Sequence, residues 1–173
     1  SAFGVAVPAY RLSREVIAQA TGGRPAGGGR AVAHYDQDAL TMGVDASLEC
    51  LDNYAGLLGS KVGGDKLATL IFASASSPYR EKQAASVLAA VLGTKRSALV
   101  TDISGSLRGG MTALGLAANA LRHGAKDDKA LIVASDRRLA APGSGEEQAF
   151  GDGAAALLLG RENVLADFVA HYA

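Results

Sequence analysis

Apolar and polar positions follow two patterns along this chain, and the two patterns alternate. Nearly continuous apolar runs lie at 66–76, 97–103 and 129–136, as in strands of a sheet covered on both faces. Between these runs, apolar residues recur at three- and four-residue spacing, which predicts helices. Strands and helices that alternate in this way indicate an α/β domain with a mostly parallel sheet.

The N-terminal third of the chain predicts a strand, a helix and a loop before its longest helix. The run 2–10 predicts a short strand that ends at Pro8, because proline cannot donate to a strand ladder. Ser13 and Gly22 have the properties of a helix N-cap and a helix stop. The glycine-rich stretch 24–36 predicts a flexible loop, because its glycines match no phosphate-binding motif.

The longest predicted helix covers residues 36–59. Asp36 or Asp38 can cap its N-terminus, where a carboxylate also interacts favourably with the helix dipole, and Gly59 can end it. Its periodic face is expected to contain Leu40, Val44, Ser47, Leu48, Leu51, Tyr54 and Leu58.

The rest of the chain predicts two more helices, at 80–93 and 108–124, and two strands after 129–136. These last two strands are expected at 151–160 and 163–173, with a polar turn between them. The predicted order is therefore β-α-α-β-α-β-α-β-β-β, with a loop at 139–148.

Composition excludes several classes of protein. The 173 residues are 49% hydrophobic with a formal net charge of zero, as expected for one soluble globular domain without a nucleic-acid footprint. No apolar stretch is long enough to span a bilayer, and the first residues lack the features of a signal peptide. We therefore expect a cytoplasmic protein that binds neither nucleic acid nor membrane.

The helix at 108–124 is unusual because small and apolar residues surround its whole circumference. Each glycine inside it costs about 1 kcal/mol relative to alanine. A helix that is apolar all round is buried all round, and small side chains let other backbones approach closely. One sheet covers only one side, so the sequence predicts that a second domain or another chain covers the other side.

Five stretches of the chain resemble the N-terminal half of the thiolase superfamily, above all archaeal 3-hydroxy-3-methylglutaryl-CoA synthases and then ketoacyl synthase III. These stretches are "GVAVPAYRLSREVIA", "HYDQDALTMGVDAS", "FASASSPYREKQAASVLAAVLG", "TDISGSLRGGMTALGLAANAL" and "FGDGAAALLLG". The resemblance implies that residues 1–173 are one thiolase-like domain with a mixed, mostly parallel five-stranded sheet. It also implies a second similar half, or a homodimer partner, stacked on it as five layers around the small-residue helix.

The resemblance also identifies two positions for chemistry, and neither residue here can perform it. Condensing enzymes of this superfamily carry an acyl-accepting cysteine at the turn before the small-residue helix, where Leu107 stands. The synthases carry a general acid/base glutamate at the strand end, where Ala75 stands. The first hypothesis is therefore a pseudoenzyme, a non-condensing scaffold or partner in acyl-CoA and lipid metabolism.

Two other hypotheses remain open. A CoA-thioester aldolase or acyltransferase could use residues of a missing C-terminal half and an OB-fold partner, with acyl-CoA as substrate and no other cofactor. A condensing enzyme would require a shifted alignment.

Ser104 and Ser106 are candidate nucleophiles, oxyanion donors or helix caps, and Arg24, Arg30 and Arg108 are candidate contacts for CoA phosphates.

Other reactive residue types have structural interpretations. The spacing of His34, His123 and His171 predicts no metal site, and His123 suits the C-terminal end of its helix dipole. Cys50, the one cysteine, is expected to be a buried, inert thiol in the long helix. Asp152 in "GDG" is expected to be a turn residue.

Overall fold

The computed structural model describes residues 1–59, 63–162 and 164–169. Its strands are β1 (Ala2–Ala6), β2 (Tyr10–Ser13), β3 (Gly29–Val32), β4 (Leu67–Ser74), β5 (Leu99–Ser104), β6 (Lys129–Asp136) and β7 (Gly153–Leu159). Its helices are α1 (Arg14–Thr21), α2 (Ala39–Leu58), α3 (Ala84–Val91), α4 (Gly109–His123) and α5 (Gly145–Ala149), with a short 3-10 helix at Gly64–Lys66.

The main sheet has five strands in the order β1-β7-β6-β4-β5. The central strand β4 pairs in parallel with both β5 and β6, whereas β7 runs antiparallel to its neighbours β6 and β1. All strands except β7 therefore point the same way. This confirms the predicted mixed, mostly parallel α/β sheet.

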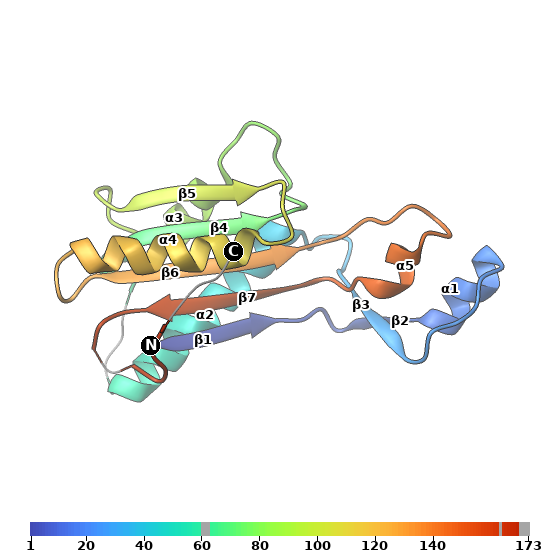
Figure 1. Ribbon diagram of the computed structural model, residues 1–173, viewed down its shortest axis with the longest axis horizontal. Helices are drawn as coiled ribbons and strands as arrows, with labels where there is room; N and C mark the ends of the chain where they lie inside the picture. Colours follow the sequence, from blue (N-terminus) through green and yellow to red (C-terminus); the bar gives the residue numbers. More distant parts are fainter. Residues whose placement is uncertain (60–62, 163, 170–173) are drawn as a thin grey trace.

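Helices cover the two faces of the sheet unequally. On one face, α2 packs against β1, β7 and β6, and α3 packs against β4 and β5; α4 lies on the other face over β4, β5 and β6 (Figure 1). The first core contains Leu67, Leu70, Phe72, Leu131, Val133 and Leu158. The second contains Ile71, Ile132, Ala113, Ala117 and Leu121.

The small-residue helix α4 contacts the sheet along one side only. Ala113 and Ala117 on that side are fully buried, whereas Met111 and Leu116 on the other side are 51% and 50% exposed. A Cβ built on Gly110 would lie 3.4 Å from the Cβ of Ala134, so the helix approaches β6 closely. Within the described chain, only the sheet covers α4, as the sequence predicts for a helix packed on a single sheet.

The long helix α2 begins and ends as the sequence predicts, with Asp38 rather than Asp36 as its N-cap. The Asp38 carboxylate accepts the Thr41 amide at 2.8 Å, the Thr41 hydroxyl accepts the Asp38 amide at 2.8 Å, and Gly59 ends the helix in the left-handed conformation. The predicted buried face is partly wrong, because Leu48 is 46% exposed and small residues are buried in its place. Close approach to the sheet requires these small residues.

Two predicted loops contain regular structure. Within 24–36, β3 pairs with β2 as an antiparallel two-stranded sheet, and α5 lies within 139–148 and the residue that follows. Both elements project to one side of the main sheet (Figure 1). Each is four or five residues long, which is too short for a periodic signal.

The strand predicted at 163–173 is wrong for residues 164–169, which form no strand. Residues 163 and 170–173, His171 among them, lie outside the described part. A strand that follows β7 in a hairpin would have to pair with it, but β7 already pairs with β6 on one side and β1 on the other. Of the helices described, none is both long and apolar enough to cross a bilayer.

A glycine pair tests the contact between β1 and α2. A Cβ on Gly4 would overlap the α2 backbone, lying 2.9 Å from the Cα of Cys50, whereas a Cβ on Gly56 meets no atom within 4 Å. We expect Gly4→Ala to lower the free energy of unfolding by about 1–3 kcal/mol. The control Gly56→Ala should raise it by about 1 kcal/mol. Urea denaturation measures both, and equal effects would contradict this packing.

The buried thiol of Cys50 gives a second prediction. Cys50 is fully buried in α2, and this burial raises the pKa of its thiol to about 11. Native protein at pH 8 should therefore react with a disulfide reagent only after denaturant is added. Rapid stoichiometric reaction without denaturant would contradict the burial of Cys50.

Candidate functional site

A pocket of about 290 Å³ lies at the carboxyl ends of β4 and β6, beside the first turn of α4. We call it the α4 pocket. The end of the pocket nearest the strand ends contains Ala75 after β4, Ser106 and Leu107 before α4, and Asp136 at the end of β6. Its apolar wall includes Met111, Leu114, Ile132 and Leu157. Ligands in open α/β sheets commonly bind at this edge, so the pocket is the candidate site.

Leu107 and Ala75, which are far apart in the sequence, line this same pocket. Gly105 makes the sharp turn between β5 and α4 with a φ of 79°, a conformation that favours glycine. Leu107 follows at the N-terminal end of α4 and is 68% exposed. Its side chain therefore borders the pocket without forming a closed core.

Of the two candidate serines, only Ser106 lines the α4 pocket. Its hydroxyl accepts a hydrogen bond from the Arg108 amide at 3.1 Å, and its carbonyl accepts one from the Gly109 amide at 3.1 Å. These bonds order the turn before α4, but the N-cap of α4 is Arg108, which makes no side-chain cap hydrogen bond, so the expectation that a serine caps this helix is wrong. Ser104 is exposed at the end of β5 and does not line the pocket.

The three candidate arginines are not among the residues that line the α4 pocket. Arg24 is exposed in the segment between α1 and β3, and Arg108 directly follows Leu107. The Arg30 guanidinium donates to the backbone carbonyls of Glu147 and Arg138 at 2.9 and 3.4 Å. The structure therefore places Arg30 in internal contacts between β3 and α5.

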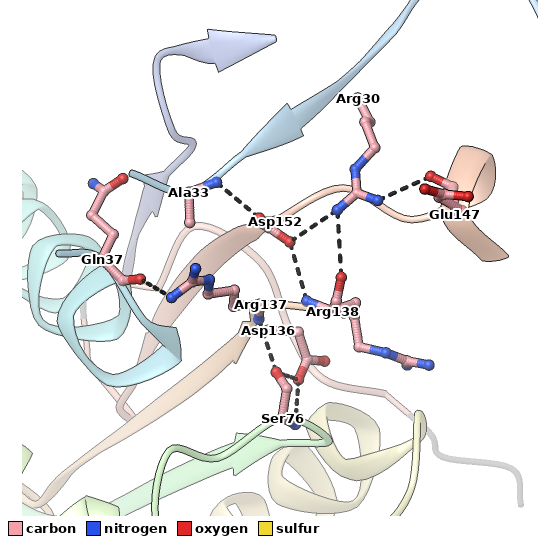
Figure 2. A network of polar contacts seen from close by, with 9 residues as sticks. All are labelled: Arg30, Ala33, Gln37, Ser76, Asp136, Arg137, Arg138, Glu147 and Asp152. Carbon is pink, nitrogen blue, oxygen red and sulfur yellow. Dashed lines mark hydrogen bonds and ion pairs between the residues drawn. The ribbon is translucent and has the colours of Figure 1, made fainter. Parts of the chain in front are cut away.

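Asp152, predicted as a turn residue, is a buried acceptor with 6% exposure. Figure 2 shows its carboxylate accepting the Ala33 amide at 2.8 Å and the Arg138 amide at 3.1 Å, with the Arg30 guanidinium 3.7 Å away. Asp152 thus ties the β2–β3 sheet to the ends of β6 and β7. Local sequence contains no signal for this role, because the partners come from two other segments, β3 with the residue after it and the segment after β6.

Asp136 is the pocket residue that sequence reasoning missed. Its carboxylate accepts hydrogen bonds from Ser76 and from the backbone that follows β4, and the Ser76 hydroxyl accepts the Arg137 amide at 2.8 Å (Figure 2). The available signal was its position, because a polar residue that ends a buried parallel strand lies at the edge where ligands bind.

The histidines lie away from the α4 pocket where the structure describes them. His34 stacks on Tyr10 with ring centroids 5.2 Å apart, and its Nδ1 lies 2.6 Å from Asp36, a hydrogen bond that lowers the pKa of Asp36. His123 lies in the last turn of α4, as predicted. The described residues contain no cluster of three His, Cys, Asp or Glu side chains that could hold a metal ion.

No protein-family model matches the chain. Comparison with curated proteins finds several relatives that carry the same name. The chain is 30% identical to a hydroxymethylglutaryl-CoA synthase of Caldivirga maquilingensis, covering 95% of this chain and 47% of that protein. It is 29% identical to the same enzyme of Pyrobaculum neutrophilum, covering 99% and 49%. The chain therefore spans about half the length of the curated relatives it matches.

This chain also covers about half of the length of solved structures that have the same fold. An HMG-CoA synthase complexed with CoA superposes with a TM-score of 0.77 at 22% identity, covering 93% of this chain and 41% of that one. A 3-oxoacyl-(acyl-carrier-protein) synthase III gives 0.73 at 22% identity, covering 90% and 48%. The chain therefore carries one half of the thiolase fold, and in sequence it resembles the hydroxymethylglutaryl-CoA synthases.

Proposed function

We propose that this chain is one half of a thiolase-fold module in acyl-CoA metabolism that does not form an acyl-cysteine intermediate. One observation carries the proposal: Leu107 stands at the N-terminus of α4 and shares a pocket with Ala75. Cys50, the one cysteine of the chain, is buried in α2 on the opposite face of the sheet. The pocket therefore has no thiol within reach.

The chemistry of the two side chains supports this proposal. Covalent acyl transfer needs a nucleophile with a lone pair, and leucine has none. General acid/base catalysis needs a titratable group within hydrogen-bond reach, and alanine cannot supply one. In the condensing enzymes that the chain resembles, a cysteine and a glutamate stand at these positions. We infer a non-condensing scaffold or partner, that is, a pseudoenzyme with respect to condensation.

Apolar residues on the exposed side of α4 support the inference that a partner covers this half. Met111, Leu116 and Leu107 are at least half exposed on it, and Phe3 and Leu157 are exposed on the same face of the sheet. Contiguous apolar surface of this kind is typical of an interaction site. We infer that a second thiolase-like half, or a second copy of this chain, covers it. Residues 1–173 then form a single domain of a larger unit.

A second candidate function is favoured by the open state of the α4 pocket. Leu107 borders the pocket without closing it, and Ser106 and Asp136 supply polar groups beside it. An aldolase-type or acyltransferase enzyme could bind a CoA thioester here and use catalytic residues of a C-terminal half or an OB-fold partner. Such an enzyme would need the partner for turnover.

The proposal predicts that the protein is not acylated. After incubation with acetyl-CoA, the intact mass of the chain should be unchanged, because the α4 pocket offers no thiolate. Mass spectrometry of the whole protein measures this directly. An acetyl adduct would contradict the proposal, and peptide mapping with Ser104→Ala and Ser106→Ala variants would show whether a serine carries it.

A cysteine introduced at position 107 tests whether this turn is the nucleophile position. In Leu107→Cys the thiol stands at the N-terminus of α4, so its pKa should fall from about 8.5 to about 7.5 or below. In the control Leu116→Cys the thiol stands about two turns further along the exposed side of α4, beyond the reach of the helix N-terminus, and should keep a pKa of about 8.5. The pH dependence of iodoacetamide alkylation gives both values. Equal pKa values would argue against this assignment of position 107.

A further inference from the structure

Asp136 is the one ionisable side chain among the described residues that line the α4 pocket. All its hydrogen bonds within the described chain go to one oxygen, Oδ1. This atom accepts the Ser74 hydroxyl at 3.1 Å, the Ala75 amide at 2.8 Å, and the Ser76 amide and hydroxyl at 3.0 and 2.8 Å. These bonds hold the carboxylate in one orientation at the end of β6.

The second oxygen, Oδ2, accepts no hydrogen bond from any residue in the part of the chain that the structure describes. A carboxylate offers about four lone-pair sites on its two oxygens, so Oδ2 keeps its full acceptor capacity. Asp136 is half-buried at the pocket, so this capacity is open to a bound molecule.

The pocket also contains two serines, but the Ser74 hydroxyl donates to Asp136 and the Ser106 hydroxyl accepts the Arg108 amide. The rest of the pocket wall is apolar. Met111 and Leu114 of α4 face it from one side, and Ile132 and Leu157 from the sheet. A mostly apolar pocket with one fixed polar group selects ligands by the chemistry of that group. Here the group is an anionic acceptor, which attracts a hydrogen-bond donor and repels another anion.

The N-terminus of α4 carries a partial positive charge, which favours a bound anion, but this charge is smaller than that of Asp136. A helix N-terminus is equivalent to roughly +0.5 elementary charge, against a full negative charge on Asp136. The amides of Arg108 and Gly109 at this end already donate to Ser106. The carboxylate therefore dominates the electrostatic preference of the pocket.

We propose that the α4 pocket binds a small aliphatic molecule through a donor head group, an ammonium above all, which Asp136 Oδ2 accepts. A molecule of the same length that ends in a carboxylate is disfavoured. This inference rests on the proposed function in one respect, because it takes the pocket to bind its ligand without covalent attachment.

The experiment is an NMR titration of the whole chain with n-butylammonium, n-butanol and butyrate at neutral pH. The amide signals of Ala75, Gly109 and Gly110 report on the pocket. We expect saturable shifts with n-butylammonium, binding at least about tenfold tighter than butyrate, with n-butanol between them. Butyrate binding as tight as n-butylammonium, or no binding by either, would overturn the inference.

Asp136→Asn tests the role of Oδ2 separately from that of Oδ1. The amide keeps an acceptor for the Ser76 and Ala75 contacts, and it replaces Oδ2 with a donor and removes the charge. We expect n-butylammonium binding to weaken by about tenfold and the preference over butyrate to disappear. The control Asp52→Asn, at an exposed position of α2, should bind as the unmodified chain does.

A second variant covers the case in which Asp136→Asn does not fold. Met111→Lys places a cation on the exposed rim of the pocket, where it can pair with Asp136. It should also weaken n-butylammonium binding, and unchanged binding in either folded variant would overturn the inference. The acetyl-CoA experiment involves neither change, so failure of the proposed function is seen separately, as an acetyl adduct.

Discussion

The close approach of α2 to the main sheet is the constraint on which the rest of the structure depends. Gly4 of β1 lies against the backbone of α2, and Gly43 of α2 lies over the Phe72 ring, where a Cβ would be only 2.9 Å away. Contact this close fixes the position of β1 beside β7, and β7 then has no free edge for another strand. It also explains why the buried face of α2 contains small residues and why Leu48 faces outward.

Carboxylates at defined points of the sheet connect this packed core to the irregular segments. Asp102 of β5 accepts the amides of Ala84 and Ala85 at 2.7 Å each, which fixes the start of α3. Asp136 orders the segment after β4, and Asp152 ties the β2–β3 sheet to the main sheet. Hydrogen bonds to charged acceptors are stronger than neutral ones, so one side chain can order several backbone groups.

These two features together define the α4 pocket and explain its chemical character. The turn at Gly105 presents Leu107 at the start of a long helix, and the Asp136 contacts fix Ala75 on the other side of the pocket. Both side chains, Leu107 and Ala75, are aliphatic, and our proposal that the chain does not form an acyl-cysteine intermediate rests on them. The pocket keeps an anionic acceptor and an apolar wall, which favours binding over covalent catalysis as its remaining role.

The sequence by itself determined the alternation of strands and helices, the caps of α1 and α2, the bounds of β6 and the turn before α4. These features depend on neighbours within a few residues, so periodicity, glycine and capping residues record them. Only the tertiary structure decided the β2–β3 pairing, the orientation of α2, the absence of a strand at 164–169, and the roles of Asp136 and Asp152. Each of these depends on which distant segments meet, because a hydrogen-bond partner or a close backbone contact far along the chain leaves no local pattern.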